Sequence, residues 1–162
     1  MPGSLKRLDV LFPERTLQEI LAARPPAVHA VAPGDLVGVA LQRMAQHDIG
    51  LVVVLEAERL VGVLSERDLA REAGRSQSGA LRDLRVADLM VRDVATVDRD
   101  ASFAHCLALM NERGARHLPV LAGGRVVAVI SIRDLLREAV THHAHVLAEL
   151  ERERLLAFQP GV

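Results

Sequence analysis

Two short segments of the chain place a serine hydroxyl and a carboxylate three residues apart, with an arginine just before the carboxylate. They are Ser65-Glu66-Arg67-Asp68 and Ser131-Ile132-Arg133-Asp134. A carboxylate accepts hydrogen bonds from both hydroxyls of a ribose, and a guanidinium suits a phosphate. Ser-x-x-Asp is also a helix-capping pattern, in which the acidic side chain bonds back to the cap residue. The pattern alone favours capping, and the two roles compete for the same carboxylate oxygens.

Both segments belong to an internal repeat with a constant offset of 66 residues (131 − 65 and 134 − 68). The offset extends on both sides of them, from Val31 and Val97 as far as Ala73 and Ala139. Such a repeat means two copies of one unit, each of which is small for a core of its own. We therefore expect the units to pack face to face about a pseudo-twofold axis, so that a site in one has a counterpart in the other.

Each unit is predicted to have the order β-α-β-β-α, which gives an α/β (α+β) fold. In the first unit, strands are expected at 28–31, 51–55 and 60–64 and helices at 36–48 and 65–74. In the second unit, strands are expected at 95–97, 117–121 and 126–130, with helices at 103–113 and from 131 onward. Gly50 is expected to take the left-handed backbone that often ends a helix.

The repeat divides the chain into an N-terminal segment 1–15, a first unit 16–74, a linker 75–85, a second unit 86–140 and a C-terminal tail 141–162. A short helix is expected to lead into each unit, near 16–23 and near 86–90. Because no proline precedes Pro160, the last helix can continue into the tail as a helical extension. Val140, Leu147 and Leu150 then fall on one side, which we expect to pack on its own module or on a partner subunit.

Composition excludes several classes of function. Half of the 162 residues are apolar and the net charge is −1. Apolar runs such as 51–55 are far shorter than the roughly 20 residues of a membrane span, and no signal-peptide pattern is present. We therefore expect a cytoplasmic protein with no membrane partner. The single cysteine, Cys106, lies in an apolar helical pattern, and no common catalytic motif is present, so we expect no enzymatic activity.

One cluster in the tail has the side chains of a metal site. His142, His145 and Glu149 share a helix face and could contact a metal ion. No cysteine or further acidic residue supports zinc there. A solvated histidine cluster is therefore the better interpretation, and no metal site is predicted.

The order of the elements and several motifs resemble the cystathionine-β-synthase (CBS) domain family in its tandem form, the Bateman module. The resemblance covers roughly residues 16–140. Its marks are the hydrophobic-x-Ser-x-x-Asp-Leu ending of both units, Asp88-Leu89-Met90 ahead of the second unit, and Arg116-His117-Leu118-Pro119-Val120 on its middle strand. The resemblance implies a disc-like pair of units that commonly forms a homodimer. It also implies an adenosine-containing ligand in the cleft between the units: AMP, ADP, ATP, S-adenosylmethionine or NAD.

For such a ligand we expect the phosphates at the helix starts, where free N–H groups and the helix dipole favour an anion. The carboxylates would hold the ribose, and whether Mg²⁺ accompanies a polyphosphate stays open. The base is expected among aliphatic strand residues, with backbone groups contacting its edge. The predicted binding residues are Ser65, Arg67, Asp68, Val28, Ala30, Val94, Thr96, Arg116, His117, Ser131, Arg133 and Asp134.

The two half-sites are not equivalent. Nucleotide-binding members of the family often carry a threonine after the Asp-Ile-Met-like segment, where this chain has Val91 and, by the offset of 66, Pro25. The first unit also lacks the Arg-His-x-Pro signature, so we favour the half-site of Asp134.

Three functions stay open. The first is a stand-alone regulatory sensor that passes ligand binding on to an effector protein. The second is a ligand-free dimerisation or interaction module. The third is RNA binding, against which the neutral charge and the few aromatic residues count.

Overall fold

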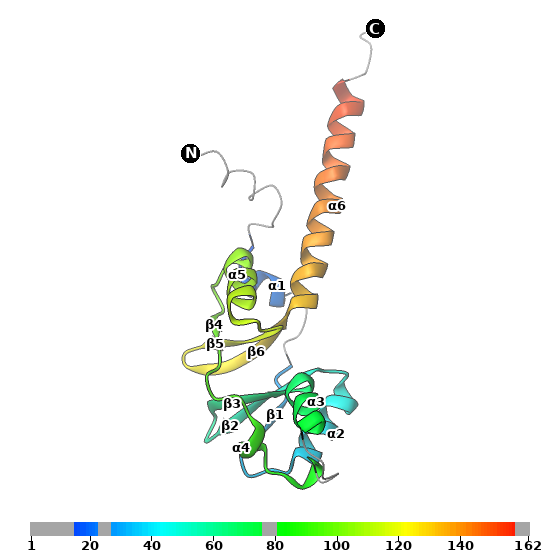
Figure 1. Ribbon diagram of the computed structural model, residues 1–162. Coiled ribbons are helices and arrows are strands. Elements are labelled where there is room, and N and C mark those ends of the chain that lie inside the picture. The colour runs from blue at the N-terminus through cyan, green and yellow to red at the C-terminus, as the bar shows by residue number, and fades with distance from the viewer. Residues whose placement is uncertain (1–14, 23–26, 76–80, 158–162) are drawn as a thin grey trace.

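The computed structural model describes residues 15–22, 27–75 and 81–157, and in it the two units are stacked with one long helix rising from the second (Figure 1). Each unit has a three-stranded sheet in which the first strand is parallel to the second and the second is antiparallel to the third. The predicted mixed α/β arrangement of two related units is therefore confirmed. The strands are β1 (Ala30–Val31), β2 (Leu51–Glu56), β3 (Arg59–Ser65), β4 (Val97–Asp98), β5 (His117–Ala122) and β6 (Arg125–Ser131).

The helices also correspond between the units, because equivalent apolar positions face equivalent cores. In α2 the buried residues are Val37, Ala40 and Met44, and in α5 they are Phe103, Cys106 and Met110, each 66 residues further on. This spacing puts one face of each helix against its sheet. The helices are α1 (Leu17–Ala22), α2 (Val37–His47), α3 (Glu66–Arg75), α4 (Val86–Leu89), α5 (Phe103–Arg113) and α6 (Ile132–Ala157), with a 3₁₀ turn η2 at Leu81–Asp83.

The short helix ahead of each unit packs against the other unit, as Figure 1 shows for α1 and α4. Leu17 and Ile20 of α1 belong to the core of the second unit, and Val86 of α4 belongs to the core of the first. In sequence these helices lead into the unit that follows, as predicted. In space they are exchanged, so neither core is complete without the short helix that begins the other unit.

The exchange also changes which residues of the two leading helices correspond to each other. Thr16 forms a β-bridge with Ser102, and Arg85 forms the equivalent bridge with Leu36. Thr16 and Arg85 are 69 residues apart (85 − 16), so the offset of 66 does not extend to the leading helices. At this spacing of 69 residues the counterpart of Val91 is Ala22, whereas Pro25, which the offset of 66 pairs with Val91, lies outside the described residues.

The end of α2 also differs from the prediction made from the sequence. The residue with left-handed backbone at the end of α2 is Asp48 (φ 50°), and its counterpart after α5 is Gly114 (φ 59°). Gly50 does not take this conformation. A side chain at Gly50 is disfavoured for another reason: its Cβ would lie 3.1 Å from Glu66 Oε2 and 3.5 Å from His117 Cε1. Gly50 thus marks a close approach of the two units.

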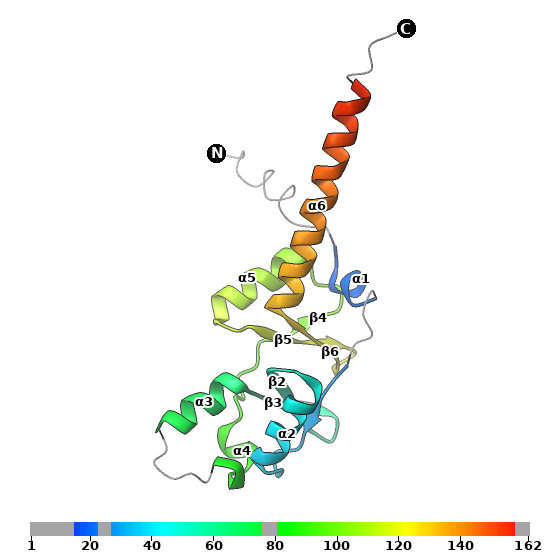
Figure 2. The same ribbon diagram turned by 90° about the vertical axis from the view of Figure 1, so that its right-hand side faces the viewer.

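The long helix α6 contacts its own unit only near its start. That part packs on α5 and β6, and the rest projects away from both units (Figures 1 and 2). Val140 is 69% exposed, and Leu147 and Leu150 are also exposed. Within the described residues this side is therefore not packed on its own module, contrary to one of the two expectations. No described helix combines the length and the apolar character needed to cross a membrane.

Candidate functional site

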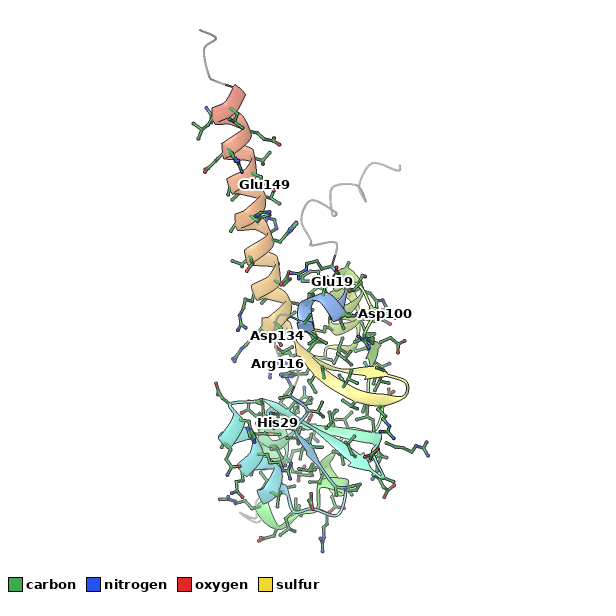
Figure 3. All side chains as sticks on the ribbon, turned by 180° about the vertical axis from the view of Figure 1, so that it is seen from behind. Glu19, His29, Asp100, Arg116, Asp134 and Glu149 are labelled. Atoms are coloured by element: carbon green, nitrogen blue, oxygen red, sulfur yellow. The ribbon has the colours of Figure 1, made fainter. Side chains whose placement is uncertain are left out.

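A cleft of about 1500 Å³ lies between the two units. Its lining includes the starts of α3 and α6, which carry the two Ser-x-x-Asp segments, and the strands β3 and β6 between them. Figure 3 shows Asp134 at the base of α6 and Arg116 where the second unit borders the first. His29 belongs to the first unit. The pseudo-twofold arrangement therefore brings both segments to one cleft.

Nine of the twelve predicted binding residues line this cleft, and three do not. The three are Val28, Ala30 and Thr96; Thr96 lines a separate, open pocket instead. Neighbouring side chains along an extended segment point to opposite sides, and here the flanking residues Ala27 and His29 line the cleft. The nine are Ser65, Arg67, Asp68, Val94, Arg116, His117, Ser131, Arg133 and Asp134.

Both Ser-x-x-Asp segments form reciprocal capping boxes. The hydroxyl and N–H of Ser65 donate to Asp68 Oδ2 at 2.5 and 3.1 Å, and the N–H of Asp68 donates to Ser65 Oγ at 3.3 Å. The equivalent distances for Ser131 and Asp134 are 2.6, 2.9 and 3.2 Å. The capping interpretation is thus confirmed in both units. In both units the capping hydrogen bonds that the serine donates are accepted by the same carboxylate oxygen, Oδ2.

The arginines of the cleft differ in how they are bound. Arg67 Nη1 donates to the carbonyl of Gly114 at 3.1 Å, which ties the start of α3 to the end of α5 across the two units. A cation is favourable at such a helix C-terminus. Among the described residues, the guanidinium groups of Arg116 and Arg133 form no hydrogen bond or ion pair, although the backbone carbonyl of Arg116 accepts the N–H of Ile132 at 2.9 Å. These two guanidinium groups are therefore available to bind an anion in the cleft.

His117 lies where the units meet, at the start of β5 and close to Gly50. Burial lowers the pKa of His117, the cations of Arg116 and Arg133 lower it further, and the carboxylates of Asp134 and Glu66 oppose the change. The imidazole is therefore neutral at neutral pH. Its position in the first unit is taken by Leu51, so only one unit has an ionisable group here.

The lowered pKa predicts how stability depends on pH. Between the pKa of a histidine in the unfolded chain, about 6.5, and the lower pKa of folded His117, the unfolded chain binds more protons. Stability therefore falls as pH falls through this window. We expect His117→Leu to reduce the loss of unfolding free energy between pH 7.5 and pH 5.5, measured by urea titration with circular dichroism. Part of the loss remains in the variant, because the pKa of His29 is lowered too. An unchanged loss in the variant would contradict this role.

A pair of histidines that lines the cleft was not predicted from the sequence. The ring centroids of His29 and His47 are 3.9 Å apart and the ring planes are inclined by 31°. Burial lowers the pKa of His29, and electrostatic interactions with His47 and Arg43 lower it further. His29 precedes β1 and His47 ends α2, so no motif spacing joins them. The one available signal was that His29 stands between two residues already expected near the base.

The other reactive groups lie apart from the cleft. His145 contacts Glu149 at 3.2 Å on the exposed side of α6. Within the described parts of the chain, no three or more His, Cys, Asp or Glu side chains are grouped so as to hold a metal. Burial raises the pKa of Cys106 to about 11, so this thiol is a poor nucleophile at neutral pH.

Comparison with known proteins decides the family. The model of the CBS domain matches residues 12–75 and 86–141, which together hold both Ser-x-x-Asp segments. The chain belongs to the CBS-domain family. Its two matches make it a CBS pair, a regulatory type of module.

Relatives of this CBS pair agree with the fold. The present chain is 34% identical to a putative signal-transduction protein with CBS domains from Burkholderia ambifaria MC40-6. The two structures match with a TM-score of 0.73 over 78% of this chain and 95% of that chain. The present chain is 32% identical to an uncharacterized 17.7 kDa protein of Acidianus ambivalens, over 72% of this chain and 70% of the relative. A CBS domain pair in complex with 5′-methylthioadenosine and S-adenosyl-L-methionine shares the fold at 22% identity, with a TM-score of 0.66 over 77% and 95% of the two chains.

Proposed function

We propose that this CBS pair is a regulatory module that binds an adenosine-containing ligand in the cleft between its units. One observation carries the proposal: both Ser-x-x-Asp helix starts open onto a single cleft that also contains Arg116 and Arg133. Ligand pockets typically have volumes of about 300–1,000 Å³, so a cleft of about 1500 Å³ is large enough for a nucleotide. The complex of a CBS pair with two adenosine compounds supports this class of ligand.

Each group in the cleft has a role that its chemistry suits. The carboxylate of Asp134 or Asp68 accepts hydrogen bonds from the ribose hydroxyls. A phosphate lies at the start of α6, where backbone N–H groups, Arg116 and Arg133 favour negative charge. The half-site of Asp134 is preferred because Arg116 has only Gly50 as its counterpart in the first unit.

Regulation requires that the ligand bind two states of the module with different affinity. Contacts that cross between the units, such as the bond from Arg67 to Gly114, are the ones that a ligand in the cleft would strengthen or break. The proposed output is a change in how the module meets a cytoplasmic effector protein or a second copy of itself. No catalytic step is part of this proposal.

Thermal unfolding in the presence of candidate ligands tests the proposal. The panel is AMP, ADP, ATP, NAD⁺, NADH, S-adenosylmethionine and GTP, followed with an extrinsic dye because the chain has no tryptophan. A ligand at a hundred times its dissociation constant adds about 2.7 kcal/mol, which raises the midpoint by roughly 5–10 °C for a protein of this size. We expect a rise with adenosine compounds and none with GTP. A flat response to the whole panel would contradict the proposal.

A ligand-free interaction module is the second candidate, and one observation favours it. Leu136, Val140, Leu147 and Leu150 are exposed on α6, and their spacing is that of a coiled-coil seam. A second copy of α6 would cover these side chains. Sedimentation of the full chain separates the two functions: a dimer combined with a flat ligand panel favours the interaction module, whereas a monomer contradicts it.

A further inference from the structure

The histidine pair belongs to the half of the cleft that contains Asp134. The bond from Arg67 to Gly114 places the end of α5 beside the start of α3. By the pseudo-twofold relation, the end of α2, which is His47, lies beside the start of α6, which carries Asp134. His47, His29 and Asp134 all line the cleft, in agreement with this placement.

The other half of the cleft has no such pair. The residues equivalent to His29 and His47 are Ala95 and Arg113, at the offset of 66. Arg113 forms an ion pair with Asp93 at 2.6 Å. One half therefore offers two adjacent flat rings, whereas the other offers a methyl group and a neutralised guanidinium.

Flat rings are scarce in this protein. The chain has no tryptophan or tyrosine and three phenylalanines, and the phenylalanine that the structure describes, Phe103, is 1% exposed in the core of the second unit. Among the described residues, the rings that line the cleft are those of His29, His47 and His117. Nucleic-acid bases stack favourably on aromatic rings, whatever their hydrogen-bonding edge. With their centroids 3.9 Å apart and their planes inclined by 31°, the two rings lie face over face, so one ring supports the other and an outer ring face stays available for a base.

We propose that the His29–His47 pair is the platform on which the purine of the ligand stacks, in the half-cleft of Asp134. This inference rests on the proposed function and deepens it. It replaces the aliphatic contacts expected at Val28 and Ala30 with an aromatic one. It also separates the cleft into a base position at the histidines and a ribose position at Asp134. The ligand class is therefore a nucleotide, with its base, rather than a sugar phosphate.

Calorimetric titrations of the full chain with AMP and with ribose 5-phosphate test this platform. We expect His29→Ala to weaken AMP binding about tenfold, because stacking on an aromatic side chain contributes on the order of that factor. The same variant leaves ribose 5-phosphate binding unchanged, since that compound has no base. His29→Phe keeps a flat ring and restores AMP binding. His105→Ala removes an exposed histidine outside this cleft and serves as the matched control.

Nuclear magnetic resonance of the histidine ring protons gives a second readout in the unmodified protein. A stacked adenine shifts the ring protons of His29 and His47 upfield, whereas ribose 5-phosphate leaves them in place. Equal weakening of both compounds by His29→Ala, or unmoved ring protons under saturating AMP, would overturn the platform while the proposed function stands. If the unmodified protein binds none of the adenosine compounds, the proposed function itself fails.

Discussion

Leu17→Ala is expected to lower the free energy of unfolding by about 2–5 kcal/mol, although Leu17 stands at the very start of the first unit in a helix of six residues. The side chain is fully buried in the core of the second unit, together with Ile20 and Phe103. A helix this short has little stability of its own, so the loss comes from the packing that the variant removes. Urea unfolding followed by circular dichroism measures it.

The matched control is a leucine that the structure leaves in solvent. Leu155 on α6 is 73% exposed, and Leu155→Ala should change the unfolding free energy by less than about 0.5 kcal/mol. If Leu17→Ala has an equally small effect, α1 does not complete the core of the second unit and the exchange of leading helices is contradicted.

Asp134→Ala is expected to weaken AMP binding about 10- to 100-fold, because hydrogen bonds to a charged group contribute about 1.5–3 kcal/mol. Its effect on the ligand-free protein is smaller. Loss of the capping box with Ser131 should lower the unfolding free energy by about 1 kcal/mol. Calorimetric titration measures the first quantity and urea unfolding measures the second.

A second capping carboxylate outside the cleft provides the control for Asp134→Ala. Asp88 Oδ2 accepts the N–H of Arg85 at 3.2 Å at the start of α4, and Asp88 does not line the cleft. We expect Asp88→Ala to cost a similar amount of stability and to leave AMP binding unchanged. A loss of stability without a loss of affinity in Asp134→Ala would leave that carboxylate with the capping role alone.

Local patterns in the sequence predict most of the elements. The β-branched runs and the apolar spacing give the β2–β3 and β5–β6 hairpins and the helices α2 and α5 within a few residues, because each pattern follows directly from which face is buried. The Ser-x-x-Asp pattern likewise predicts the capping boxes, since all of their atoms lie within four residues. The repeat predicts that both boxes reach one cleft.

Features that depend on tertiary contacts were not predictable in this way. The leading helices carry too few residues to show which core they complete, so their exchange was missed. Asp48 rather than Gly50 takes the left-handed backbone at the end of α2, and Gly50 instead lies where Glu66 and His117 approach it closely. The His29–His47 contact joins two residues from different elements, and only the fold brings them together.

The most direct test of the central claim is a titration of isotopically labelled protein with AMP, followed through its backbone amide resonances. We predict saturable shifts at Ser65–Asp68 and Ser131–Asp134, the two helix starts that face the cleft, and at His29. The amides of the projecting half of α6, such as Leu150, should stay in place. No shift under AMP, ATP or S-adenosylmethionine, or shifts confined to positions outside the cleft, would contradict an adenosine-binding role for this CBS pair.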